Sequence, residues 1–130
     1  MNFFFDHNMP PRLARTLDFL EGERGCRVQY LTQVGFAQDA KDSEWIAELE
    51  AQGGWVIITK DSGGSKDPSE RKAWRECKCP VVLVAGTLLE QDFWELAAKV
   101  IKAWPHIKST IEKSTSMHFL LSANAKITPV

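Results

Sequence analysis

The chain has 130 residues, of which 44% are hydrophobic and 25% are charged, and its formal net charge at pH 7 is −1. This balance is typical of one globular domain and argues against a basic nucleic-acid coat protein or a disordered acidic segment. No apolar run approaches the roughly 20 residues of a membrane span, and no basic region precedes the first apolar residues as in a signal peptide. We therefore expect a single cytoplasmic domain over residues 1–130, without membrane association.

The first half of the chain predicts strands and helices in alternation. Phe3-Phe4-Phe5 is a buried strand by composition, and the helix after it begins at the prolines 10–11 and ends at Gly22 or Gly25. The apolar face of this helix is expected to hold Leu13, Leu17 and Leu20. A second strand is predicted at 28–31, a polar loop at 32–41 and a helix capped by residues 42–44 and ended at 53–54.

The second half continues the alternation. Buried strands are predicted at 55–59 and 81–85, with a glycine- and serine-rich loop at 62–65 and a helix from Pro68 to Glu76 between them. Apolar residues then recur at helical spacing from Phe93 to Trp104, and Pro105 either ends this helix or kinks it into another at 107–113. Residues 117–121 and 127–130 are expected to form a hairpin. The chain is thus an α/β protein with a mostly parallel sheet and helices on both faces.

Several acids fall where a parallel sheet gathers its ligand-binding residues. Asp6 follows the first strand, and Lys60 and Asp61 follow the third. Asp42 and Glu44 stand at the start of a helix that has to begin at the same edge of the sheet. Because ligands of such sheets bind outside the carboxyl ends of the strands, these side chains are expected to share one pocket, although each acid alone also suits a turn or a helix cap.

Carboxylates gathered in one pocket repel one another unless a cation neutralises them. Mg²⁺ and Mn²⁺ prefer oxygen ligands and are held by a few carboxylates together with water and phosphate oxygens. Such a site activates a bound water for attack on a phosphodiester, as nucleases and phosphatases do. The sequence carries no GxxxxGK[ST], GxGxxG or GxSxG motif that would favour another chemistry.

Three blocks of this sequence resemble bacterial PIN-like domains. The run from Phe4 to Ala14 resembles their first strand, its terminal aspartate, an Asn-x-Pro turn and a helix. The run from Asp42 to Ile46 resembles the acidic start of a later block, and the run from Gly54 to Asp61 resembles a strand written gWvvlTkD. Residues 68–71 fit one subfamily as well, so the resemblance extends over nearly the whole chain.

This resemblance implies an α/β/α sandwich and a ribonuclease that depends on Mg²⁺ or Mn²⁺, often the toxin of a toxin–antitoxin pair. The acids that match the metal ligands are Asp6, Asp42 and Asp61, with Glu44 in place of Asp42 if the register differs by two. Asn8 would support the first acid or contact phosphate, and Lys60 would screen the acids or contact phosphate. A departure follows the third acid, where PIN nucleases place a fourth: here the stretch is 62–67, and Asp67 is the acid in it.

The expected partners are RNA, a small antitoxin protein and a second copy of the chain. Residues 1–65 hold ten acids and six bases, whereas residues 66–130 hold seven acids and ten bases. The bases expected to flank the pocket and neutralise phosphates are Lys66, Arg71, Lys72, Arg75, Lys78, Lys99, Lys102 and Lys108. A homodimer would use the apolar stripe of residues 93–104 and the C-terminal hairpin.

Two other classes of function stay open from the sequence. One is a non-catalytic PIN-like module that binds a partner protein through the pocket or a sheet edge. The other is a phosphatase or a phosphotransfer receiver, since acids at strand ends beside a lysine also suit a phosphorylated aspartate. A receiver would carry a lysine after a late strand, and residues 81–86 end without one.

Overall fold

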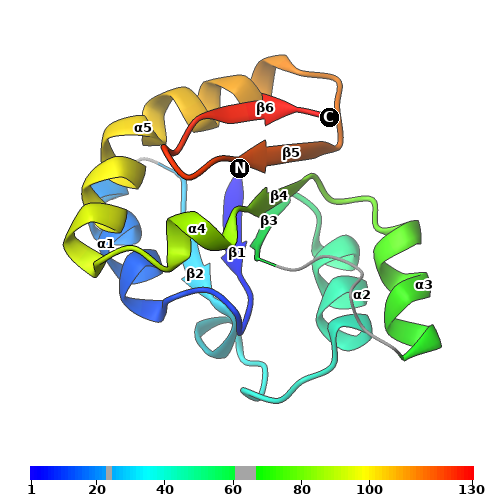
Figure 1. Cartoon of the computed structure of the whole chain (residues 1–130). Helices are drawn as coiled ribbons and strands as arrows, with labels where there is room; N and C mark the ends of the chain where they lie inside the picture. Colours follow the sequence, from blue (N-terminus) through cyan, green and yellow to red (C-terminus); the bar gives the residue numbers. More distant parts are fainter. Residues whose placement is uncertain (23–24, 61–66) are drawn as a thin grey trace.

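The computed structural model describes residues 1–22, 25–60 and 67–130, and within these ranges the strands form one six-stranded sheet in the order β2-β1-β3-β4-β5-β6 (Figure 1). β1 to β5 pair in parallel with their neighbours, and β6 pairs antiparallel with β5. The strands are β1 (Asn2–Phe5), β2 (Val28–Tyr30), β3 (Trp55–Thr59), β4 (Val81–Val84), β5 (His118–Leu121) and β6 (Ile127–Pro129). The predicted α/β architecture with a C-terminal hairpin is confirmed.

Helices cover both faces of the sheet. α1 and α5 lie on one side and α2 and α3 on the other (Figure 1). The helical segments are α1 (Pro11–Glu21), the 3₁₀ turn η1 (Leu31–Val34), α2 (Asp42–Gln52), α3 (Pro68–Glu76), α4 (Gly86–Leu89) and α5 (Phe93–Lys113). Among the described residues, none of these helices combines the length and the hydrophobicity that crossing a membrane requires.

The three consecutive phenylalanines of β1 are buried because both faces of this central strand are covered. Successive side chains of a strand point to opposite faces. Phe3 packs against Trp104 of α5 with ring centroids 4.7 Å apart, and Phe4 packs against Trp45 of α2 at 4.8 Å. β1 therefore carries the core on both sides and holds Asp6 at its carboxyl end.

Several local features differ from the predictions. The second strand ends at Tyr30, and Leu31 begins a 3₁₀ turn inside the predicted loop. Leu20 is 57% exposed, because the buried face of α1 continues through Leu17 to Glu21 instead. The cap position of α2 is Lys41, so Asp42 is the first helical residue, and the short helix α4 follows β4 without having been predicted.

Pro105 neither ends nor divides its helix, because α5 runs through it from Phe93 to Lys113. The apolar stripe of this helix is buried against the sheet, with Leu96, Val100 and Trp104 all below a tenth exposed. The stripe is thus part of the protein's own core, and the prediction that it forms a dimer surface is wrong for these residues.

Candidate functional site

The carboxyl ends of β1 and β3 lie side by side, and Asp6, the acid predicted after the first strand, is placed there. The parallel register pairs Phe5 with Ile58, which sets Asp6 next to Thr59. The amide of Asp6 donates to the carbonyl oxygen of Ile58 at 3.4 Å, and the amide of Met9 donates to the carbonyl oxygen of Asp6 at 3.1 Å. This short turn after β1 holds the Asp6 side chain over the end of the sheet.

Asp6 is a buried carboxylate, only 1% exposed. Its Oδ2 accepts a hydrogen bond from the hydroxyl of Thr59, and its Oδ1 accepts one from the backbone amide of Asn8 at 3.1 Å. Burial raises the pKa of Asp6 to about 6, although the Thr59 hydroxyl, the charge of His7 and the Asn8 amide all act to lower it. Because burial disfavours the charged form, a nearby cation would stabilise the ionised carboxylate.

Asp42 connects the two helices on one face of the sheet and lies within electrostatic range of Asp6. It is the first residue of α2 and is partly buried. Its Oδ2 accepts a hydrogen bond of 2.8 Å from the indole nitrogen of Trp74, and its backbone amide donates to Oε1 of Glu70 at 3.2 Å. The charge of Asp42 contributes to the raised pKa of Asp6 as the smallest of its causes, so the two carboxylates interact electrostatically.

The remaining predicted residues occupy different positions. Glu44 is exposed on α2, and Asn8 is exposed and supports Asp6 through its backbone amide. Lys60 is exposed as well, and its side chain lies over Gly86, where an added Cβ would come within 3.5 Å of Lys60 Cε. Lys60 therefore reaches across the end of β4. Asp61 lies outside the described residues.

Glu70 was not predicted as a site residue. It stands in the first turn of α3, and its carboxylate accepts the hydrogen bond from the Asp42 amide. Its signal in the sequence was of the same kind as that of Asp42, an acid just after the start of a helix that begins at this edge of the sheet. Asp67, the candidate fourth acid, caps α3 by accepting hydrogen bonds from the amide and the hydroxyl of Ser69, at 2.9 and 2.7 Å.

The chemistry of the described donors fits a hard divalent cation. Asp6 and Asp42 supply carboxylate oxygens, and Mg²⁺ is commonly held by one or two carboxylates with water and substrate phosphates completing the shell. Over residues 1–22, 25–60 and 67–130, no group of three or more histidine, cysteine or acidic side chains is gathered closely enough to hold a metal. Asp6 and Asp42 would therefore supply only part of the ligands of such an ion.

The predicted basic residues do not form one surface around this site. Arg71, Lys72 and Arg75 are exposed on α3, on the same side of the sheet as Asp42. Lys108 lies on α5, across the sheet, where it forms an ion pair with Glu21. Lys99 of the same helix donates to Oε1 of Gln91 at 2.7 Å. Lys108 therefore does not flank the acids, and Lys66 lies outside the described residues.

Comparison with known families identifies residues 1–86 as a PIN like domain. The matched region extends from β1 to the first residue of α4 and includes Asp6, Asp42 and Glu70. Searches of curated proteins and of solved structures found no match. A domain of this kind indicates a nuclease type of function in general terms. Since the family model covers well over half of the sequence and the parallel α/β sheet agrees with it, this chain belongs to the PIN-like domain family.

Proposed function

We propose that the protein is a metal-dependent ribonuclease that hydrolyses phosphodiester bonds of RNA with Mg²⁺ or Mn²⁺. The observation that carries this proposal is the Asp6 carboxylate, which is 1% exposed at a strand end, has a pKa raised to about 6 and lies in the field of Asp42. A buried carboxylate in the field of a second acid is costly for the fold even when, as for Asp6, it accepts two hydrogen bonds. A bound cation would offset this cost, which explains why the protein retains two acids at this position.

The residues around the acids have separable roles in this proposal. Asp6 and Asp42 would hold the ion together with Asp61. When bound, the ion would supply an activated water and would stabilise negative charge on the phosphate. The Thr59 hydroxyl and the Asn8 amide orient Asp6, and the Trp74 indole orients Asp42.

The exposed residues of the same edge would contact the substrate. The Lys60 side chain lies over Gly86, and its charge is available to an RNA phosphate at the mouth of the site. The side chain of Asn8 is also exposed beside Asp6. A phosphate held there would be next to the carboxylates, which is the arrangement that an in-line attack by water requires.

The test is cleavage of a fluorescent single-stranded RNA with Mn²⁺ by the wild type and by Asp6→Asn. We expect the wild type to cleave, chelation to stop it, and Asp6→Asn to lose at least a hundredfold in rate. Glu48→Gln is the matched control, since Glu48 is an exposed acid on α2 that bonds Gln52 within its own helix. Equal cleavage by wild type and Asp6→Asn would contradict the proposal. Absence of cleavage in both would support a PIN-like binding module instead.

Family membership also supports a more specific proposal, that the protein is a cytoplasmic toxin neutralised by a small antitoxin protein. Induced expression in a bacterial host is then expected to arrest growth, and Asp6→Asn is expected to relieve the arrest at equal protein levels. Growth arrest that persists in Asp6→Asn would separate toxicity from the acids. Normal growth with active RNA cleavage in vitro would contradict the toxin role and leave the nuclease proposal intact.

A further inference from the structure

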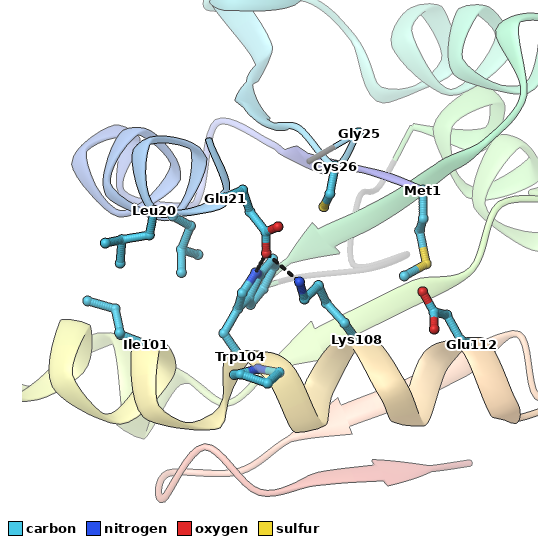
Figure 2. A pocket seen from close by; sticks show the side chains of 11 residues that line it. Met1, Leu20, Glu21, Gly25, Cys26, Ile101, Trp104, Lys108 and Glu112 are labelled. Carbon is cyan, nitrogen blue, oxygen red and sulfur yellow. Dashed lines mark hydrogen bonds and ion pairs between the residues drawn. The ribbon is translucent and has the colours of Figure 1, made fainter. Parts of the chain in front are cut away.

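A second candidate site lies near the amino ends of β1 and β2, whereas the acids lie at the carboxyl ends of the strands. Here a cavity of about 440 Å³ opens between the end of α1 and the middle of α5 (Figure 2). Met1 and Cys26, which line it, precede β1 and β2, whereas Asp6 follows β1. At about 3.3 Å per residue, β1 separates the cavity from Asp6 by about 17 Å. The volume falls within the range of small-molecule pockets.

Glu21 is the buried charged group of this cavity. It is the last residue of α1 and is 7% exposed. Its Oε1 accepts a hydrogen bond of 2.7 Å from the indole nitrogen of Trp104 and another from the ammonium group of Lys108. Trp104 and Lys108 are one turn apart on α5, so this single oxygen attaches the end of α1 to α5.

The second oxygen of Glu21 is not used by this attachment. Among the described residues, Oε2 has no hydrogen-bond partner. It also remains accessible to solvent, because the only fully buried side-chain polar atom without a partner in the described ranges is Nε1 of Trp45. Figure 2 shows Oε2 directed away from Trp104 and Lys108. A carboxylate oxygen that is desolvated yet open to a cavity favours a ligand that donates a hydrogen bond.

The side chains around Glu21 indicate the charge of such a ligand. Glu112, one turn beyond Lys108 on α5, adds a second acid to the lining, which also includes Met1, whose α-ammonium group acts on Cys26. Cys26 adds no negative charge, because burial and the charge of Glu21 both raise the pKa of its thiol. The open oxygen therefore decides the class of ligand: a carboxylate oxygen binds a charged donor such as an ammonium group more strongly than a neutral donor.

The other end of the cavity is apolar. Leu17 and Leu20 of α1 and Ile101 of α5 line this end, and Figure 2 shows Leu20 opposite Ile101. The side chain of Leu20 is 57% exposed. The exposed apolar surface of Leu20 is in contact with water, and a ligand that covers this surface would gain free energy by removing it from water. We propose that the cavity binds a small primary amine with an apolar tail, its ammonium group on Oε2 of Glu21 and its tail between Leu20 and Ile101. This site is independent of the proposed nuclease activity.

The test uses three probes of equal length, n-hexylamine, n-hexanol and n-hexanoate. Binding is followed by NMR through the indole N–H of Trp104, which is assigned by its disappearance in Trp104→Phe. We expect n-hexylamine to shift this signal saturably, n-hexanol at least tenfold more weakly and n-hexanoate not at all. Equal shifts with the amine and the carboxylate, or no shift with n-hexylamine at millimolar concentration, would overturn the proposal.

Two substitutions with opposite expected effects complete the test. Glu21→Gln keeps an acceptor for Trp104 and Lys108 but removes the charge, so the affinity for n-hexylamine is expected to fall at least tenfold. Lys108→Met removes the competing ammonium group, so the affinity is expected to rise severalfold. Glu48→Gln, far from the cavity on α2, is the control. If Glu21→Gln does not fold, an unchanged or weakened affinity in Lys108→Met overturns the proposal.

Discussion

The hydroxyl of Thr59 donates a hydrogen bond to the carboxylate of Asp6, which joins the ends of β1 and β3 across 53 positions of sequence. Both side chains are almost completely buried, with Asp6 at 1% and Thr59 at 0% exposure. The bond favours the ionised carboxylate, whereas burial favours the protonated one. The balance between these two effects sets the charge of the candidate site near neutral pH.

Thr59→Val is expected to move this balance toward protonation. Valine has nearly the same shape but no hydroxyl, so burial is opposed by fewer interactions and the pKa of Asp6 rises above its present value of about 6. Carbon-13 NMR titration of the Asp6 carboxyl carbon measures the change directly. Thr128→Val, on the exposed edge strand β6, is the control and should leave the titration unchanged. An unaltered pKa in Thr59→Val would show that the bond is electrostatically unimportant.

Asp6→Asn is expected to stabilise the fold at neutral pH. The pKa of Asp6 is raised from 3.8 to about 6 on folding, so the folded protein binds more protons in this interval. Asp6 therefore contributes to stability below about pH 4, and this contribution is lost as the pH rises through 6. Removing the charge should therefore raise the free energy of unfolding at pH 7.5 by about 3 kcal/mol.

Urea denaturation at pH 4 and at pH 7.5 measures this effect, and the advantage of Asp6→Asn should shrink at the lower pH. Asp39→Asn, an exposed acid in the loop before α2, provides the comparison. A variant that loses cleavage but gains stability would show that Asp6 is kept for function. Destabilisation of Asp6→Asn at both pH values would instead assign the carboxylate a structural role.

Trp74→Phe is expected to impair the site through Asp42. The indole nitrogen of Trp74 holds Oδ2 of Asp42 at 2.8 Å, and the ring packs edge-on against Trp45 with centroids 5.5 Å apart. Phenylalanine keeps much of the packing but not the donor, so the Mn²⁺ concentration for half-maximal cleavage should increase severalfold. Stability should fall by about 1 kcal/mol, as for one lost hydrogen bond. Trp94→Phe, on an 81% exposed ring, should change neither quantity.

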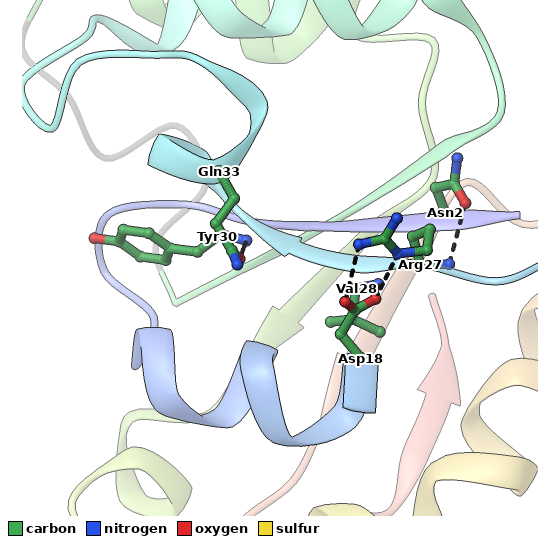
Figure 3. Close-up of polar contacts among 6 residues, drawn as sticks. All are labelled: Asn2, Asp18, Arg27, Val28, Tyr30 and Gln33. Atoms are coloured by element: carbon green, nitrogen blue, oxygen red, sulfur yellow. Dashed lines mark hydrogen bonds and ion pairs between the residues drawn. The ribbon is translucent and has the colours of Figure 1, made fainter. Parts of the chain in front are cut away.

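A polar contact between α1 and β2 gives a prediction on stability alone (Figure 3). Asp18 accepts hydrogen bonds from Nε and Nη2 of Arg27 at 2.9 and 3.1 Å and from the amide of Val28 at 2.9 Å. The Arg27 guanidinium lowers the pKa of Asp18, so this contribution is present at neutral pH and is lost as the pH falls through that pKa. Asp18→Ala should cost about 1 kcal/mol, mainly through the unpaired Val28 amide.

Thermal denaturation at pH 7 tests this prediction, with Arg27→Gln as the companion variant. Arg27 is exposed, and exposed ion pairs contribute little, so Arg27→Gln should cost less than Asp18→Ala. The reverse order would show that the ion pair, rather than the backbone bond, holds the edge strand. RNA cleavage should be unaffected in both variants, because Asp18 lies near the end of α1 that is remote from Asp6.

The elements that could be predicted from the sequence are those whose signal is local. Phe3 to Phe5 form a continuous apolar run because β1 is covered on both faces, and Pro68 begins α3 because its fixed backbone angle suits a first helical turn. Leu20 and Pro105 depend on tertiary contacts instead. An apolar residue at helical spacing is buried only if a neighbouring element covers it, and a proline stays within a helix when the packing of α5 on the sheet holds it there.

The composition, the near-neutral net charge and the order of elements already determined an α/β protein with acids at its strand ends. Tertiary structure alone decided which groups meet. Asp42 contacts Trp74 across 32 positions, and Glu21 contacts Trp104 across 83. Periodicity and capping act over a few residues, whereas these contacts depend on how helices pack on a sheet. For the same reason the sequence shows only the total number of bases in the second half. In the structure, many of them are divided between α3 and α5, which lie on opposite faces of the sheet (Figure 1).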